Sequence, residues 1–232
     1  VKGVPHLTPD LFAWEYNSEN VSMLPSIINT LLLTALALVI VVRIGIFSAI
    51  YMVEYAKKGN KIVSIVRVTA ETLSGIPSIV YGLFGMIFFV GVCNFGNSLL
   101  AGALTVAIMV LPTVMRTTEE ALLSVPNSYR EGSFGLGAGK LRTVFKVVLP
   151  SAVPGILSGI ILATGRIVGE TAALIYTAGT VAEVSKGLLS SGRTLAIHMY
   201  VLSSEGLYTN QAYATAVVLL IFVCLLYTSD AA

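Results

Sequence analysis

Long, uninterrupted apolar runs set the hydrophobic pattern of this chain. Polar residues gather between the runs and do not alternate with apolar ones inside them, as they would in the strands of a membrane barrel. Each run approaches or exceeds the roughly 20 residues that a helix needs to cross about 30 Å of hydrocarbon. The pattern therefore predicts membrane-spanning helices at about residues 27–50, 72–92, 98–115, 151–177 and 211–227.

The composition supports the same class of protein. Of the 232 residues, 56% are hydrophobic and 11% are charged, and the mean hydropathy is +0.87. Soluble domains carry about 25% charged residues. We therefore expect an all-α integral membrane protein, a polytopic bundle of about five transmembrane helices. Cys93 and Cys224 stand alone without metal-ligand spacing, so we interpret them as small apolar residues of helices.

The basic residues lie almost entirely in one set of alternate loops. That set holds ten Lys and Arg residues, whereas the other set holds three together with five acidic residues. Cytoplasmic loops carry the excess of positive charge in membrane proteins. Residues 116–150 are therefore predicted to form a cytoplasmic loop, and residues 1–26 and 178–210 to lie outside. The first set is Arg43, Lys57, Lys58, Lys61, Arg67, Arg116, Arg130, Lys140, Arg142 and Lys146; the second is Lys2, Lys186 and Arg193, with Asp10, Glu15, Glu19, Glu183 and Glu205.

The two ends of the chain carry little functional information. The chain begins at Val1, and no signal peptide precedes its polar first segment. An exterior start suits a chain that lacks one earlier span, so we expect such a span upstream. Residues 228–232 end an apolar run abruptly, and we assign them no function.

A glycine-rich stretch at residues 135–140 of the cytoplasmic loop invites comparison with a nucleotide-binding P-loop. A P-loop requires a further glycine at the position of Phe134 and a Ser or Thr at the position of Leu141. The dinucleotide pattern Gly-x-Gly-x-x-Gly also fails. We therefore expect no nucleotide site in this loop.

Short helices fit the loop better. The pattern favours a helix at residues 129–136, a turn at Gly137 and Gly139, and a basic amphipathic helix at residues 141–148. One interpretation is a surface loop whose basic residues face lipid head groups. Nearby, Glu71 is spaced to pair with Arg67 at i, i+4. We expect the charged residues that begin the loop to orient it; these are Arg116, Glu119 and Glu120.

A second interpretation comes from the spacing inside this loop. Glu131-Gly132-Ser133 is followed by three residues and Gly137, and then by nine residues and Val147-Val148-Leu149-Pro150. This arrangement resembles the signature loop of ABC-importer permeases, Glu-Ala-Ala, three residues, Gly, nine residues, Ile-x-Leu-Pro. In that family the loop forms a coupling helix that docks on a separate ATPase subunit. The resemblance implies that these residues couple the chain to an ATPase: Tyr129, Arg130, Glu131, Gly132, Ser133, Gly137, Leu149 and Pro150.

Longer stretches narrow the resemblance. Residues 73–85, 111–138 and 165–179 resemble the permeases of phosphate-specific importers, and residues 5–14 resemble the A-type rather than the C-type subunit. The resemblance implies a type I importer fold with six spans in the full-length family and a cytoplasmic coupling helix. It also implies a C-type sister subunit, an ABC ATPase dimer and a periplasmic phosphate-binding protein, in a bacterial inner membrane. ATP and Mg²⁺ would be bound by the ATPase, and we expect no cofactor and no nucleic acid on this chain.

Two charges stand inside the fourth predicted span. A charge at mid-membrane costs about 2.5–3.5 kcal/mol on insertion scales, so Arg166 and Glu170 are expected to have a purpose. One interpretation is a structural ion pair, since i and i+4 share a helix face. The other is a substrate pathway, completed by Thr171, in which Arg166 binds phosphate through its planar fork of donors. Glu170 would then accept the proton of HPO₄²⁻, which sulfate lacks.

Other functions remain open alternatives. The same kind of permease carries sulfate, molybdate or an amino acid, and a membrane component that senses phosphate would share much of the sequence. An intramembrane enzyme is disfavoured, because neither a Gly-x-Ser-x-Gly elbow nor a His-Glu-x-x-His motif occurs. His6 and His198 also lack metal-ligand spacing. We therefore expect a non-catalytic transport subunit.

Overall fold

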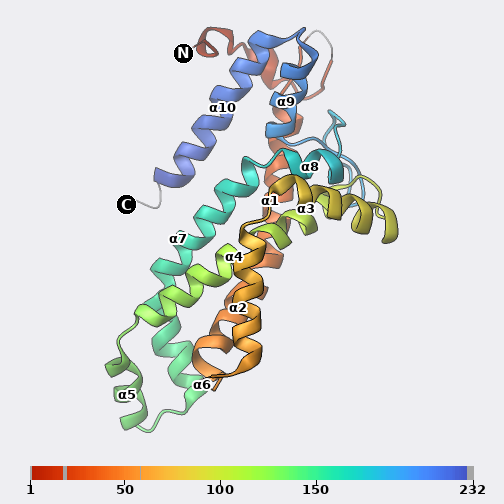
Figure 1. Cartoon of the computed structure of the whole chain (residues 1–232). Coiled ribbons are helices and arrows are strands. Elements are labelled where there is room, and N and C mark those ends of the chain that lie inside the picture. The colour runs from red at the N-terminus through yellow and green to blue at the C-terminus, as the bar shows by residue number, and fades with distance from the viewer. Residues whose placement is uncertain (1, 18–19, 58, 229–232) are drawn as a thin grey trace. The chain divides into compact units, whose positions relative to one another are not determined.

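The computed structural model describes residues 2–17, 20–57 and 59–228, and within these ranges every regular element is helical (Figure 1). Glu19 and Lys58 of the charge count, and residues 229–232 of the tail, lie outside the described residues. The chain divides into two compact units. The first comprises Val1–Ile40, Ile76–Met109 and Thr164–Ala232, and the second comprises Val41–Gly75 and Val110–Ala163.

Four of the described helices are long and apolar enough to cross a membrane. They are Leu24–Tyr55, Leu99–Ser124, Lys140–Val168 and Thr209–Thr228. A fifth candidate is a bent pair, Lys61–Ser74 with Ser78–Val92. The all-α membrane class predicted from hydropathy is therefore confirmed. In detail the elements are η1 Val4–His6, η2 Pro9–Phe12, α1 Leu24–Ile50, η3 Tyr51–Tyr55, α2 Lys61–Ser74, α3 Ser78–Gly85, η4 Met86–Val92, α4 Leu99–Ser124, α5 Asn127–Gly135, α6 Lys140–Thr143, η5 Val144–Val148, α7 Leu149–Val168, α8 Ala172–Thr177, α9 Leu195–Glu205 and α10 Thr209–Thr228.

The helix ends differ from the predicted span ends at three places. The pair α2 and α3 bends by 103° around Gly75 and Pro77, because proline lacks an N–H group and disfavours helix at the residue before it. Helix α4 continues beyond residue 115 to Ser124, where Pro126 prevents a further turn. Helix α7 ends at Val168, so the expected continuation to residue 177 is a separate short helix, α8.

In the second unit, small residues let α4 and α7 approach closely. A side chain at Gly159 would collide with Thr117 of α4, and one at Gly155 would lie 2.8 Å from the Ala121 methyl carbon. Around this contact lies an apolar cluster to which α1, η3, α2, α4, η5 and α7 contribute. Its most buried members are Ala49, Leu122, Val144 and Val148. This core supports the end of the unit that carries α5 and α6 (Figure 1).

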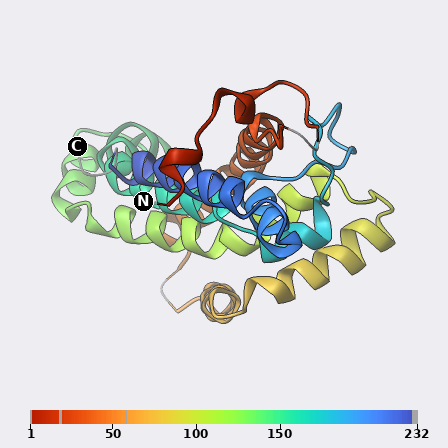
Figure 2. The same ribbon diagram turned by 90° about the horizontal axis from the view of Figure 1, so that it is seen from above.

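In the first unit, the N-terminal turns lie against the start of α10 (Figure 2). Leu11 and Met23 share a buried cluster there with Leu195 and Ala214. Elsewhere in the unit α3 packs on α8, where an added side chain at Gly82 would lie 2.8 Å from the Ala173 backbone. These contacts hold α8, which follows α7 in the chain, and α9 within the unit.

Candidate functional site

The predicted substrate residues lie where α7 ends and α8 begins. Arg166 is half-buried in the last turn of α7, and Glu170 is buried, 9% exposed, in the turn that follows. Thr171 is half-buried and precedes the first residue of α8. The structure therefore gathers all three residues at one junction between two helices.

Glu170 caps α8 and does not pair with Arg166. Its Oε1 accepts a hydrogen bond from the backbone N–H of Ala173 at 3.0 Å. A carboxylate at this position satisfies an amide that has no partner within the helix. The interpretation as an i, i+4 ion pair was wrong, because α7 ends at Val168 and the two side chains do not share a helix.

Arg166 has no acidic partner within ion-pair distance among the described residues. Arg166 interacts electrostatically with Tyr81, a buried residue of α3. Tyr81 belongs to the stretch 73–85 that resembles phosphate permeases, but nothing in its sequence position indicated a place near Arg166. A guanidinium without a carboxylate keeps its donors available for an anionic ligand.

Thr171 lines a pocket of about 360 Å³ between α9 and α10. Tyr200 and Ser203 of α9 and Thr209 and Tyr213 of α10 give this pocket several hydroxyl groups. Sequence reasoning missed these residues because the exterior loop at 178–210 was not expected to contain a helix. The hydroxyls are spread among apolar neighbours, and the pocket carries no charged lining residue.

The predicted coupling residues divide into two groups. Tyr129, Glu131 and Gly132 lie exposed on α5, which has no buried residue at all among its nine. Gly137 takes a positive φ of 81° in the turn after α5, a conformation that glycine adopts without strain. The second group makes contacts within the unit or begins α7. Ser133 contacts Thr143 of α6, Arg130 is directed away from the loop, and Leu149 and Pro150 are the first residues of α7.

Arg130 is directed into the unit. Its Nε and Nη2 donate to Oε1 of Glu54, at 3.0 and 2.7 Å, and the two side chains are 15% and 9% exposed. Nη1 and Nη2 also donate to the carbonyls of Val125 and Leu122 at 2.8 and 2.9 Å. Sequence reasoning missed Glu54, which lies 76 residues away. Arg130 therefore holds α5 in place and does not present its charge to a partner.

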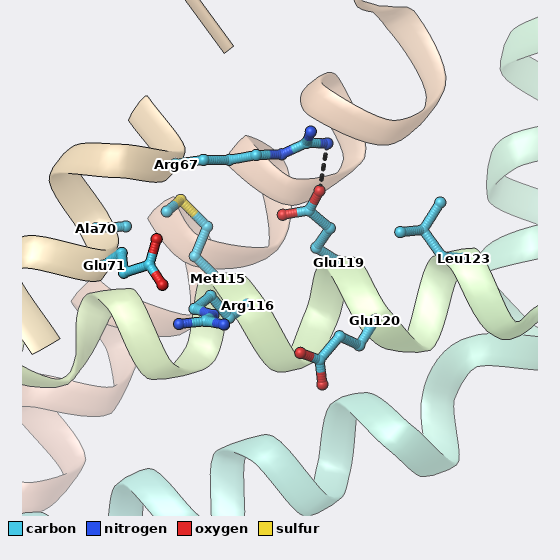
Figure 3. A pocket seen from close by; sticks show the side chains of 8 residues that line it. All are labelled: Arg67, Ala70, Glu71, Met115, Arg116, Glu119, Glu120 and Leu123. Atoms are coloured by element: carbon cyan, nitrogen blue, oxygen red, sulfur yellow. Dashed lines mark ion pairs between the residues drawn. The ribbon is translucent and has the colours of Figure 1, made fainter. Parts of the chain in front are cut away.

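A charged pocket of about 340 Å³ lies between α2 and α4 (Figure 3). Arg67 reaches across from α2 and pairs with Glu119 of α4 at 2.5 Å. The expected i, i+4 pair with Glu71 is therefore not formed, and Glu71 points into the same pocket (Figure 3). Arg116 and Glu120 also line the pocket. Its arginine and glutamate side chains link α2 to α4, and their positive and negative charges nearly balance, so the pocket does not favour an ion of either sign.

The segments predicted to lie outside contain a buried arginine, Arg193, which is 4% exposed. Its guanidinium carbon lies 4.5 Å from the ring centroid of Tyr16, while Nε and Nη2 make no hydrogen bond. The same tyrosine ring meets His198 edge-on at 6.2 Å. Burial, assisted by the charge of Arg193 and opposed by the Val21 backbone, lowers the pKa of His198 to about 3. The histidine is therefore neutral at physiological pH.

Comparisons with known proteins give a consistent result. The sequence profile of the family described as "Binding-protein-dependent transport system inner membrane component" matches residues 41–230. "Probable ABC transporter permease protein YqgI" of Bacillus subtilis (strain 168) is 35% identical over 192 residues, 77% of this chain and 65% of that protein. "Phosphate transport system permease protein PstA 1" of Mycobacterium tuberculosis (strain CDC 1551 / Oshkosh) is 38% identical over 151 residues, 65% of this chain and 49% of that protein. The chain thus spans about half to two thirds of the length of these relatives.

Solved structures agree in fold. The structure titled "Inward facing conformations of the MetNI methionine ABC transporter: CY5 native crystal form" superposes with a TM-score of 0.68. It covers 89% of both chains at 20% identity. Together these comparisons confirm the resemblance that the loop signature and the longer stretches predict.

Proposed function

Because this chain belongs to the family of binding-protein-dependent transport system inner membrane components, the permeases of ABC importers, we propose that its cargo is inorganic phosphate. The observation that carries the proposal is the half-buried guanidinium of Arg166, which has no carboxylate partner among the described residues at the end of a membrane helix. A relative named as a phosphate permease, 38% identical, supports the same cargo.

In this proposal Arg166 binds the anion through two of its donors. Guanidinium matches phosphate oxygens in a bidentate geometry, which an ammonium cannot do. Glu170 lies four residues further on, with Oε1 already accepting from the Ala173 amide. Its other oxygen, Oε2, accepts the proton of HPO₄²⁻. Sulfate has no proton to donate, so the same carboxylate repels it.

The proposed energy source is a separate ATPase that binds ATP and Mg²⁺. The exposed residues of α5, Tyr129 and Glu131 among them, form the docking surface for it. A C-type sister permease completes the pathway, a periplasmic phosphate-binding protein delivers the cargo, and the site opens alternately to each side of a bacterial inner membrane. Arg166 alone would also suit sulfate or molybdate, but the carboxylate of Glu170 favours an anion that carries a proton.

Uptake of [³²P]phosphate tests the proposal. The protein is expressed with its partner subunits in a cell that lacks its own high-affinity phosphate importer, with and without Arg166→Ala. The control is Lys2→Ala, which removes an exposed positive charge far from this junction in the sequence. We expect uptake to be lost in Arg166→Ala and kept in the control, with equal amounts of assembled complex. Uptake retained in Arg166→Ala would refute the site, and a parent complex that imports sulfate but not phosphate would refute the cargo.

A further inference from the structure

The cytoplasmic end of α1 carries an unusual turn. Residues Tyr51–Tyr55 form the π-helical turn η3, closed by a hydrogen bond of 2.9 Å from the Ala56 amide to the Tyr51 carbonyl. Such turns are rare and occur often at functional positions. Met52 of the same turn is buried in the apolar cluster of the second unit, together with Leu122 and Val125 of the chain around the end of α4. The turn is therefore packed into the apolar core of that unit.

Two neighbouring residues of this turn reach the two short helices of the coupling loop. Glu54 holds Arg130 of α5 through two hydrogen bonds to the same carboxylate oxygen. The ring of Tyr55 lies under Lys140, the first residue of α6, with Nζ at 5.1 Å from the ring centroid. Neighbouring helical residues point in different directions, so a single turn can face both helices at once.

The loop has few other attachments. Helix α5 contains no buried residue, so apolar packing does not fix its orientation. A side-chain hydrogen bond between the hydroxyls of Ser133 and Thr143, at 2.8 Å, joins α5 to α6 within the loop. Arg130 also binds two carbonyls at the end of α4. One guanidinium therefore joins α5, the end of α4 and η3.

We propose that the π-helical turn Tyr51–Tyr55 is the seat through which displacement of the coupling loop passes to α1, with Glu54 and Arg130 as the positioning pair. The inference rests on the proposed function, because it assumes that α5 is pushed by a partner ATPase. A displacement of α5 is transmitted to this turn through Glu54, and a displacement of α6 is transmitted to it through Tyr55. Without the pair, α5 keeps its exposed docking residues but slides relative to α1.

The first test measures phosphate transported per ATP hydrolysed by the full complex in proteoliposomes. The variants are Glu54→Gln, Arg130→Gln and the double mutant. Each single variant is expected to lower the ratio about fivefold or more while the ATPase remains bound. A general loss of stability would lower transport and hydrolysis together, so the ratio isolates positioning. If the residues act through each other, the double mutant should be no worse than the worse single variant. An unchanged ratio, or losses that multiply, would overturn the proposal.

Tyr55 supplies a matched pair of variants that avoids the buried charges. Tyr55 is 40% exposed, so its replacement is expected to leave folding intact. Tyr55→Phe keeps a ring beneath Lys140 and should keep the transport ratio. Tyr55→Leu removes the ring and should lower the ratio about twofold. Equal ratios in the two variants would overturn the role of the turn as a seat for α6.

A second measurement does not depend on the cargo. Spin labels are placed at Gly135→Cys on α5 and Phe47→Cys on α1, both exposed, after Cys93 and Cys224 are replaced by alanine. The expected result is one narrow distance distribution in the parent complex and a broad one in Arg130→Gln. Distance distributions of equal width in the parent and in Arg130→Gln would contradict the proposed role of the turn. If the parent complex transports no phosphate but its distribution is narrow and Arg130→Gln broadens it, the proposed cargo is refuted and the role of the turn remains supported.

Discussion

Arg130 and Arg166 are both partly buried arginines, and their surroundings are opposite. Arg130 gives its donors to Glu54 and to two main-chain carbonyls, so every branch of its guanidinium is used within the second unit. Arg166, in the first unit, has no acidic partner within ion-pair distance in the described part of the chain. The family resemblance implies a coupling role for Arg130, and the charge inside a predicted span indicates a role in substrate binding for Arg166. The structure shows that the contacts of the two side chains differ.

The difference shows how a buried positive charge is used. A guanidinium whose donors are all taken stabilises the fold and cannot bind a ligand without breaking it. A guanidinium without a counter-charge is tolerated where a ligand supplies one. By this criterion Arg130 holds α5 in place, and we propose that Arg166 binds an anion.

The same substitution at the two arginines should produce opposite results. Arg130→Met leaves Glu54 charged, buried and unpaired, which is expected to lower the free energy of unfolding by about 3–5 kcal/mol. Arg166→Met breaks no ion pair in the described residues and should change it by no more than about 0.5 kcal/mol. Chemical unfolding of the purified chain in detergent checks both values. Equal losses of stability in the two variants would contradict the view that Arg130 stabilises the fold and Arg166 does not.

The carboxylates beside these arginines offer the next contrast. In Glu170→Gln the side-chain oxygen still accepts from the Ala173 amide, so α8 should stay capped. The loss of the negative charge removes the repulsion of sulfate, and we expect the preference for phosphate over sulfate to fall about tenfold, equivalent to about 1.4 kcal/mol. Competition of sulfate with phosphate uptake measures this. An unchanged preference would remove Glu170 from the selectivity mechanism.

A third arginine, Arg193, extends the comparison; it lies in a cluster with Tyr16 and His198. Arg193 lies against Tyr16 and helps to keep His198 neutral, with a pKa of about 3 against about 6.5 in the unfolded chain. Between these values the unfolded state binds one more proton than the folded state. Stability is therefore complete above pH 6.5 and falls as the pH is lowered, by up to about 1.4 kcal/mol per pH unit.

Unfolding measured between pH 7.5 and pH 5 checks this slope. His198→Gln should flatten it, because the titrating group is gone. The exposed His6 provides the control, and His6→Gln should leave the slope as it is in the parent. A slope that persists in His198→Gln would assign the pH dependence to other groups.

The smallest expected effect concerns the exposed coupling helix. Nothing lies within 4 Å of a side chain added at Gly132, and glycine in a helix interior is unfavourable relative to alanine. Gly132→Ala should therefore stabilise the chain by about 0.4–1 kcal/mol. Gly159→Ala is the contrasting variant, since its side chain would collide with Thr117 and cost about 1–3 kcal/mol. Unfolding of the two variants in parallel checks the signs.

The long helices and the segment of short helices between α4 and α7 could be predicted from the sequence because their signals are local. Apolar runs mark the spans, and the spacing from Glu131 to Pro150 marks the loop. The bend between α2 and α3 coincides with two residues that disfavour helix, Gly75 and Pro77. The end of α7 was not, because Val168 is followed only by Gly169, and a single glycine does not stop a helix by itself.

Partners distant in the sequence could not be predicted. Nothing local links Glu54 to Arg130, and the pairing of Arg67 with Glu119 depends on how α2 lies against α4. The hydrogen-bond partner of Glu170 was not predictable either, because it depends on where α7 ends. Once the helix end moved to Val168, its expected partner at i−4 was out of reach and the nearby amide of Ala173 replaced it.

Equilibrium binding of [³²P]phosphate tests the central claim most directly. The assembled complex is held with a non-hydrolysable ATP analogue, and the parent, Arg166→Met and Arg130→Met are compared at equal amounts of folded protein. Each charge-assisted hydrogen bond contributes about 1.5–3 kcal/mol, so Arg166→Met should weaken binding about 10- to 150-fold. Arg130→Met should bind phosphate as the parent does. Parent-like binding in Arg166→Met, or an equal loss in both variants, would contradict the account.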